Sequence, residues 1–525
     1  MNPRALRLAL PANHVVLAGL LALEDGSLVR RDLWFDKEKG LIVDAQKTFY
    51  ELGQRPSTTI DLSDDIVSPG FLDIQINGAY GFDFSIFPQD DANAGKEYDS
   101  GLRMVASRIV ETGVTSATLL GWHAEGPFLH HAKRGAHMPG YLLDAPDGFE
   151  TFETIYGASA LKHQTELGNK GVNGVAHARR SPPFVRMITV APEIAGVIPA
   201  IEELFKRGVV CSIGHSIASS DTSLKAVQSG ARLITHLFNA MPQLHHRDPS
   251  IIGLLGASPI LANQKTNPDN NNNKPKSQFT YGDNTKKAQE TNSEFASEAF
   301  SDVTTPPQTP IIHPVTRGAV PPFNRTLSNA SIKGKFTPSV AAPPPIKLFK
   351  KPYYGIIVDG CHSHAHSVRV STSLLLISIF AVEALGDLVG IYRTSSRMYS
   401  YYRRFNPTFS AMPMLDPHLE DGLHDWRDNR RLIKEGVKLY IEGTDTLAGS
   451  VVTLDICVRN FVQFTGCTLG EALKCVTYNP AACLGIENRK GTLRAGADAD
   501  LVILDSDGYI KGTWVGGEEV WSTAK

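Results

Sequence analysis

The sequence predicts an α/β fold: a (β/α)8 barrel of the TIM type, joined to a small β-sandwich that both chain ends build together. Strand-like apolar runs alternate with helix-like segments in the middle of the chain, which is the pattern of a parallel sheet. The length of 525 residues suits one large closed barrel with accessory pieces. We assign residues 1–66 plus 485–525 to the sandwich and residues 67–484 to the barrel.

The sandwich is predicted from short apolar runs near each end of the chain, separated by turn residues. These runs cover residues 14–18 and 33–35 at one end and residues 501–505, 512–516 and 519–521 at the other. Since both ends carry the same pattern of short strands, we expect them to form one sandwich together.

The barrel elements follow one another in the order strand, helix, strand. We expect strands at residues 188–192, 209–213 and 233–235, with helices at residues 198–207 and 222–229 between them. This alternation favours parallel strands whose carboxyl ends meet at one face, where barrel enzymes keep their functional residues.

Two segments interrupt the barrel pattern. Residues 258–350 hold 13 of the 32 prolines and the run Asn270–Asn273, so the segment cannot bury enough apolar surface to offset its ordering entropy. We expect a disordered insertion there, whose role stays open. The atypical segment 371–409 is neither low in complexity nor cleanly periodic, and the sequence leaves open whether it folds into the barrel.

Composition excludes several classes of protein. The 52 basic and 54 acidic side chains give a net charge of −2, so no basic excess is available to neutralise nucleic-acid phosphates. The apolar run Leu374–Val382 is far shorter than the ~20 residues of a membrane-spanning helix. Six cysteines without a CxxC pair predict neither a disulfide framework nor a cysteine zinc site. We expect a cytoplasmic protein with no nucleic-acid and no membrane partner.

Three strand ends carry residues that bind metals. Glu125 lies two residues after His123 and before a Gly-Pro turn, while His215 and His236 each follow an apolar strand. One carboxylate and two imidazoles suit zinc or another first-row divalent ion with an open coordination position. The alternative is that each histidine separately caps its strand or forms a hydrogen bond in the core.

A series of motifs in this order resembles the N-acetylglucosamine-6-phosphate deacetylase family of the amidohydrolase superfamily. The resemblance covers nearly the whole chain except the two atypical segments. Its motifs are residues 69–78, 123–128, 133–137, 214–216, 235–241, 245–249, 358–362, 443–450 and 491–501.

This resemblance implies a metal-dependent amide hydrolase of amino-sugar catabolism, which converts N-acetylglucosamine 6-phosphate to glucosamine 6-phosphate and acetate. It implies one divalent ion per subunit held by Glu125, His215 and His236, with zinc as the first candidate and the identity of the metal open. Gln75 and Asn77 stand where many amidohydrolases have a His-x-His pair for a second metal.

The resemblance also implies contacts with a small sugar phosphate and a homodimer whose subunits share some phosphate contacts. Arg247 offers a planar fork that a phosphate can accept in two hydrogen bonds. The alternative for Arg247 is a surface ion pair with Asp248. The implied contact residues are Ala136, Asn239, Ala240, Arg247, Asp359, Gly360, Cys361, His362, Leu447, Ala448 and Gly449.

The catalytic residue stays unknown, because the aspartate that related enzymes use as general base is missing from its motif. Alignment places Ser410 in its position, and serine is no general base near neutral pH without a neighbouring base. Segment 371–409 is then foreign to the fold, or Glu383 replaces the aspartate, or the chain is a non-catalytic sugar-phosphate-binding protein that keeps the metal site. A hydrolase acting on another amide, such as a cyclic ureide, is a further alternative that the Arg247 region disfavours.

Overall fold

The computed structural model describes residues 13–86, 94–117, 121–167, 178–256, 351–372, 407–409, 415–426 and 429–524. The predicted insertion at residues 258–350 lies outside this part of the chain, and so do Glu383, Ser410 and the apolar run Leu374–Val382.

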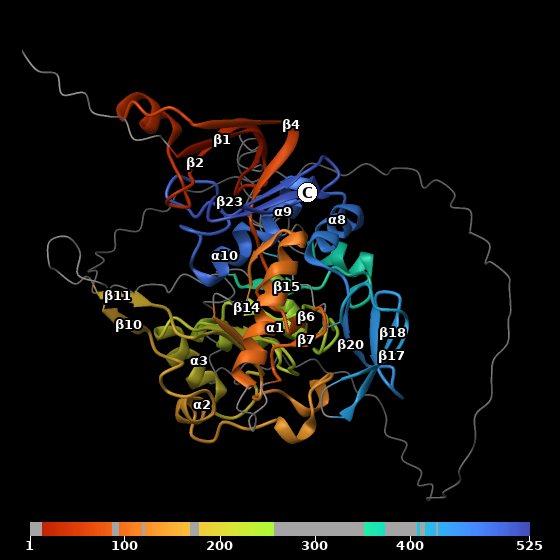
Figure 1. The fold of residues 1–525 in the computed structure, drawn as a ribbon. Helices are drawn as coiled ribbons and strands as arrows, with labels where there is room; N and C mark the ends of the chain where they lie inside the picture. Colours follow the sequence, from red (N-terminus) through yellow and green to blue (C-terminus); the bar gives the residue numbers. More distant parts are fainter. Residues whose placement is uncertain are drawn as a thin grey trace, which may run out of the picture. The chain divides into compact units, whose positions relative to one another are not determined.

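Both ends of the chain contribute strands to one seven-stranded sheet, in the order β23-β22-β21-β4-β1-β2-β3. The strands near the two termini gather in one region of the molecule (Figure 1). β1 pairs in parallel with β4, and β4 pairs antiparallel with β21, which joins the two ends. The strands are β1 (His14–Ala22), β2 (Leu28–Asp36), β3 (Leu41–Ile42), β4 (Thr58–Pro69), β21 (Leu501–Leu504), β22 (Ile510–Val515) and β23 (Glu518–Ser522).

A second sheet has six strands in the order β16-β15-β14-β13-β12-β9, and all its pairings are parallel. Its middle strands follow the predicted positions, with four to six consecutive buried residues in β12 and β13. The strands are β9 (Trp122–Glu125), β12 (Val185–Val190), β13 (Val210–Ile213), β14 (Leu233–Ile234), β15 (Tyr353–Ile356) and β16 (Pro407–Phe409). β16 shows that the end of the atypical segment 371–409 joins this sheet beside β15.

Smaller sheets complete the strand inventory of the described residues. β5 (Phe71–Leu72) and β8 (Val114–Ser116) form a parallel pair, while the remaining strands pair antiparallel. These are β6 (Gly78–Ala79) with β7 (Phe82–Asp83), β10 (Gln164–Leu167) with β11 (Ala178–Ser181), and the four-stranded sheet β17 (Gly422–Asp425), β18 (Arg431–Glu435), β19 (Lys438–Ile441) and β20 (Leu447–Ser450).

Helices lie between the parallel strands and after them along the chain. Two of the α-helices begin with side-chain caps: Ser219 accepts a hydrogen bond from the Thr222 amide, and Thr468 forms a capping box with Glu471. The α-helices are α1 (Ala94–Ile109), α2 (Phe149–Tyr156), α3 (Val197–Lys206), α4 (Ser220–Ser229), α8 (Leu454–Thr465), α9 (Leu469–Val476) and α10 (Tyr478–Leu484). The short helices are η1 (Lys47–Glu51), η2 (Val110–Thr112), η4 (His131–Lys133), η5 (Pro139–Tyr141) and η6 (Ser250–Leu255).

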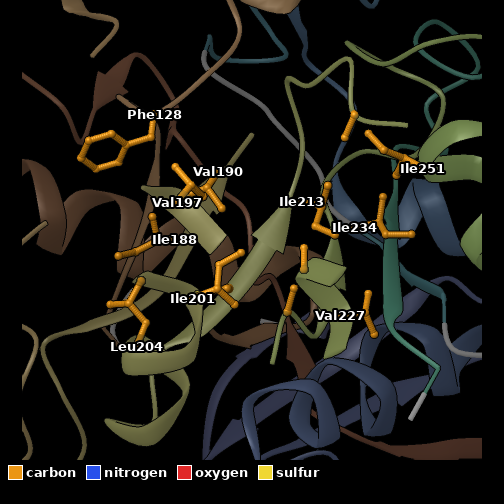
Figure 2. Close-up of a cluster of buried hydrophobic side chains, with 14 of the residues drawn as sticks. Phe128, Ile188, Val190, Val197, Ile201, Leu204, Ile213, Val227, Ile234 and Ile251 are labelled. Atoms are coloured by element: carbon orange, nitrogen blue, oxygen red, sulfur yellow. The ribbon is translucent and has the colours of Figure 1, made fainter. Parts of the chain in front are cut away.

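The largest hydrophobic cluster packs α2, α3 and α4 against the parallel sheet. Figure 2 shows Ile188 and Val190 of β12 beside Val197, Ile201 and Leu204 of α3, which supplies an apolar face at helical spacing. In the same cluster the rings of Phe128 and Phe152 stack with centroids 4.1 Å apart. This packing holds the ends of β9, β12, β13 and β14 in fixed positions.

None of the helices in the described ranges combines the length and apolar character needed to cross a membrane.

Candidate metal centre

Glu125 is the last residue of β9, and its side chain lies at the carboxyl end of the parallel sheet. The chain turns immediately afterwards at Gly126, whose φ of 82° lies in the left-handed region that glycine adopts without strain. The turn also brings the Gly126 amide to the backbone oxygen of Thr189 in β12. The carboxylate therefore sits on a rigid strand end, not on a free loop.

The structure brings the three predicted metal ligands together. Glu125 Oε1 lies 3.1 Å from Nε2 of His215 and 3.1 Å from Nε2 of His236, and the two Nε2 atoms are 2.9 Å apart. His215 and His236 are 5% and 6% exposed, so all three side chains meet in a secluded site. Within the part of the chain that the structure describes, these three side chains form a group that could hold a metal ion, because their possible ligand atoms all lie within 4.8 Å of one another.

Each histidine ring is oriented by a backbone carbonyl on its far side. His215 Nδ1 donates to the Lys133 oxygen at 2.7 Å, and His236 Nδ1 donates to the Asn239 oxygen at 3.1 Å. Because a carbonyl only accepts, each Nδ1 carries a proton, and Nε2 is the nitrogen of each ring that faces Glu125. This second contact of each ring is typical of metal-bound histidine.

The donor set fits one divalent ion. Two imidazole nitrogens and one carboxylate oxygen are zinc ligands, and three protein ligands leave a position open. The separations of 2.9–3.1 Å are close to the ~3.3 Å between ligand atoms around tetrahedral zinc. The alternative that each histidine has a separate structural role does not account for this convergence.

Electrostatics couple the three ligands. Burial raises the pKa of Glu125, but the hydrogen bonds and charges of His215 and His236 outweigh burial and hold that pKa well below its usual range. Burial lowers the pKa of His215, but its hydrogen bond and attraction to Glu125 leave the pKa above the ordinary value. The carboxylate is thus ionised over the neutral range and available to a cation.

Backbone strain is concentrated where the histidines leave their strands. His215 and His236 have φ of 49° and 30°, and Phe238 and Ala240 follow with 75° and 50°. Non-glycine residues rarely adopt such angles, which cost on the order of 1–3 kcal/mol each and gather at functional sites. The turn is held by a hydrogen bond from the Ser216 amide to the Ala240 oxygen.

Two side chains of the site were not identified as functional from the sequence. The side-chain amide nitrogen of Gln75 donates to Glu125 Oε1 at 3.2 Å, so Gln75 restrains the Glu125 carboxylate. His137 Nε2 lies 3.9 Å from Glu125 Oε2, and its ring packs edge-on against His215 at 4.8 Å between centroids. The only signal for His137 was its place in the motif 133–137.

Some of the predicted substrate contacts lie near one another. Asn239 and Ala240 form the turn directly after His236. Ala136 packs against the small hydrophobic cluster that contains Ala448, so the loop after β9 meets the strand β20, which contains Leu447 and Gly449. The Ala136 oxygen also accepts a hydrogen bond from Arg430.

Arg247 lies apart from these residues on an exposed loop. Its amide donates to His245 Nδ1, and the described residues show no ion pair between Arg247 and Asp248. Asp248 instead accepts hydrogen bonds from Ser220 and from the Ser250 amide. The guanidinium of Arg247 is therefore not held by its neighbour.

The predicted contacts Asp359, Gly360, Cys361 and His362 follow β15, which lies beside β14 in parallel register. Asp359 Oδ2 accepts a 2.6 Å hydrogen bond from His362 Nδ1, and Oδ1 accepts the amides of Cys361 and His362. Burial raises the pKa of Asp359, but these hydrogen bonds and the charge of His362 lower it below the ordinary value. The Asp359 carboxylate alone therefore links the backbone of Cys361 and His362 and the side chain of His362 within this loop.

Comparisons with known proteins agree with this architecture. Residues 349–520 match the family described as the amidohydrolase family. The chain is 29% identical to the N-acetylglucosamine-6-phosphate deacetylase of Danio rerio, covering 95% of each chain, and 28% identical to that of Caenorhabditis elegans, covering 99% of each.

Solved structures share the fold at low sequence identity. A mutant N-acetyl-D-glucosamine-6-phosphate deacetylase from Mycobacterium smegmatis, in complex with N-acetyl-D-glucosamine-6-phosphate, superposes with a TM-score of 0.60 at 20% identity. The deacetylase from Thermotoga maritima gives 0.58 at 18%. Each covers 97% of this chain and 100% of the solved chain.

The parallel sheet, the strand-end carboxylate with two histidines and the family match together define an enzyme of the amidohydrolase type. Within that class, the chain resembles the N-acetylglucosamine-6-phosphate deacetylases over nearly its whole length.

Proposed function

We propose that this protein hydrolyses the acetamide of N-acetylglucosamine 6-phosphate, giving glucosamine 6-phosphate and acetate in amino-sugar breakdown. The observation that carries the proposal is the convergence of Glu125, His215 and His236 at the carboxyl end of the parallel sheet, with both Nε2 atoms turned inward. The relatives named for this reaction support the choice of substrate.

The proposed cofactor is one divalent ion, with zinc as the first candidate, bound by Glu125, His215 and His236. When bound, such an ion activates water and polarises an amide carbonyl. The chain itself buries the site, orients both imidazoles through Lys133 and Asn239, and holds the Glu125 carboxylate ionised. Gln75 contributes an amide and not an imidazole, which favours a single ion.

The substrate is proposed to bind between the turn after His236, the loop after β15 and strand β20. Asn239 and Ala240 offer backbone groups to sugar hydroxyls, and Asp359 keeps the Gly360–His362 loop closed. Arg247, exposed and without an ion-pair partner among the described residues, is proposed as a phosphate ligand. We further propose a homodimer in which such phosphate contacts cross between subunits.

The strands are proposed to close into the (β/α)8 barrel predicted from the sequence. The six parallel strands and the parallel pair β5 and β8 support this architecture. The seven-stranded sheet is proposed as the core of the accessory domain, from residues 1–66 and 485–525.

A second candidate function is a sugar-phosphate-binding protein that keeps the metal site without catalysis. It is favoured by the sequence after β16, where Ser410 occupies the position of the general base of related enzymes. Ser410 and its alternative Glu383 both lie outside the described residues. Loss of a general base alone lowers the rate by about 10²–10⁴-fold.

The experiment that decides between the two functions measures acetate. Zinc-loaded protein is incubated with N-acetylglucosamine 6-phosphate, acetate is followed by proton NMR, and binding is measured by calorimetry at the same concentrations. Acetate released catalytically by the wild type but not by His215→Ala supports the hydrolase. Binding without acetate from the wild type contradicts the hydrolase and supports the binding protein.

A further inference from the structure

Behind the candidate metal centre, four polar side chains form a continuous hydrogen-bond chain inside the parallel sheet. His123 Nε2 lies 2.8 Å from Thr189 Oγ1, Thr189 Oγ1 lies 2.8 Å from Thr235 Oγ1, and Ser212 Oγ contacts the same Thr235 oxygen. The three hydroxyl residues are fully buried, each with 0% of its surface exposed. We call His123, Thr189, Thr235 and Ser212 the hydroxyl chain.

The hydroxyl chain connects the strands that carry the metal ligands. His123 lies on β9 two residues before Glu125, Ser212 lies on β13 three residues before His215, and Thr235 directly precedes His236. Thr189 of β12 is in register with Glu125 on one side and with Ser212 on the other. Each member therefore sits within three residues of a ligand or beside it in the sheet.

The donors and acceptors of the chain fit one arrangement. The Ile74 carbonyl, 2.8 Å from His123 Nδ1, can only accept, so this nitrogen carries the proton of the neutral ring. Nε2 then accepts from the Thr189 hydroxyl, which leaves the Thr189 oxygen to accept from Thr235 and the Thr235 oxygen to accept from Ser212. Each hydroxyl therefore donates its single proton in the same direction, toward His123.

The packing around the chain leaves little freedom for it to rearrange. A Cβ atom added at Gly214, next to His215, would lie 2.7 Å from Thr235 Cβ and 3.0 Å from Thr189 Cγ2. The backbone before His215 thus rests directly on the two threonines. A change in either side chain is transmitted to the strand ends because a packed core does not deform continuously.

We propose that Thr189 and Thr235 are positioning residues that set the spacing of Glu125, His215 and His236, and so the metal affinity and coordination geometry. The proposal rests on the metal site of the proposed function. The ligands themselves are held by Lys133, Asn239 and Gln75 from outside the sheet, whereas the hydroxyl chain fixes the three strand ends relative to one another from within. Such outer partners typically affect metal affinity by about 10–100-fold.

The test uses the near-isosteric variants Thr189→Val and Thr235→Val, which remove one hydroxyl and keep the shape. Each variant removes two hydrogen bonds of the hydroxyl chain, so each is expected to weaken zinc binding by about 10–100-fold. The conservative variant Thr189→Ser keeps the hydroxyl and is expected to restore most of the affinity. Affinity is measured by competition with a chromophoric chelator, and geometry by the visible absorption of the cobalt-substituted protein.

A matched control separates positioning from general destabilisation. Thr513 is equally buried but belongs to the terminal sheet, where its hydroxyl donates to the Val110 oxygen. Thr513→Val is expected to lower the melting temperature of the metal-free protein without altering zinc affinity or the cobalt spectrum. The double variant Thr189→Val/Thr235→Val is expected to lose less affinity than the two single losses combined, because both act through one chain.

The outcomes are distinct. If the wild type binds zinc, and Thr189→Val and Thr235→Val bind it with the same affinity and give the same cobalt spectrum, the positioning role is wrong. The proposed metal site is then unaffected. A loss of zinc affinity in Thr513→Val as large as in the other two variants also overturns the positioning role. A wild type that binds no divalent ion contradicts the proposed metal site itself and the inference with it.

Discussion

Gln75 donates a hydrogen bond from its amide nitrogen to Glu125 Oε1, the oxygen that faces both His215 and His236. Gln75 is buried and lies two residues after Asp73. The Asp73 carboxylate accepts a hydrogen bond from the backbone amide of Gln75. Gln75 thus restrains the carboxylate of the proposed metal site through its side-chain amide.

Replacing Gln75 by leucine is expected to weaken zinc binding by about 10-fold, because Glu125 loses the contact that orients its carboxylate. The dissociation constant, measured against a chelator, checks this. Gln54→Leu, at an exposed glutamine of the terminal region, is the control and is expected to bind zinc as the wild type does. Equal affinity in Gln75→Leu and wild type would show that the hydrogen bond is dispensable for Glu125.

His215→Ala is expected to abolish stoichiometric metal binding, because one of three ligands is lost and two remain, too few to retain a divalent ion tightly. Metal content per chain after dialysis, measured by atomic emission, is the readout. His364→Ala removes an exposed histidine of another loop and is expected to leave one ion per chain. Full metal content in His215→Ala would refute the ligand assignment.

The sequence predicts the convergence of Glu125, His215 and His236 because each follows an apolar strand, and the ends of parallel strands meet at one edge of the sheet. It could not predict the hydroxyl chain in the same way. A buried threonine within an apolar strand such as β12 looks like any other β-branched residue until register places Thr189 beside Thr235. Gln75 was recognised as a missing ligand, but its contact with Glu125 depends on tertiary structure.

Some strands of the fold can be predicted from their local sequence, whereas others are defined only by the strands they pair with. Strands β12 and β13 are uninterrupted buried runs, so their positions follow from the sequence. The four-stranded sheet β17 to β20 was not predicted. Its strands have only four or five residues of mixed polar and apolar character, and in β18 only the alternate residues Leu432 and Lys434 are buried. Such short amphipathic strands are ordinary loop sequence until they pair.

Phe152→Ala is expected to lower the free energy of unfolding by about 3–5 kcal/mol, because a fully buried ring stacked on Phe128 is replaced by a cavity. Urea unfolding followed by far-ultraviolet circular dichroism checks the value. Phe205, on the neighbouring helix α3, is 57% exposed, and Phe205→Ala is expected to cost less than about 1 kcal/mol. Equal costs for the two variants would contradict the burial of Phe152.

Because of the Asp359 carboxylate, we expect the free energy of unfolding to decrease at acidic pH. Because its pKa is lowered in the folded protein, the ionised group stabilises the fold at pH values above the ordinary value of 3.8, and this contribution is lost as the pH falls below it. Asp359→Asn is therefore expected to cost roughly 1–3 kcal/mol at pH 7, where a charged acceptor of His362 and two amides is removed. The asparagine keeps one acceptor oxygen, so the loop is not left wholly without partners.

The measurement compares urea unfolding of the metal-free wild type and Asp359→Asn at pH 7 and at pH 3.5, since acid would otherwise displace metal and obscure the comparison. The difference between the two proteins is expected to shrink at the lower pH, because Asp359 becomes protonated in the unfolded chain and its stabilising charge no longer contributes fully. Asp147→Asn, at an exposed aspartate, is the control and is expected to unfold like the wild type at both pH values. A difference of the same size at pH 7 and pH 3.5 would mean that Asp359 stabilises the loop through its shape and not through its charge.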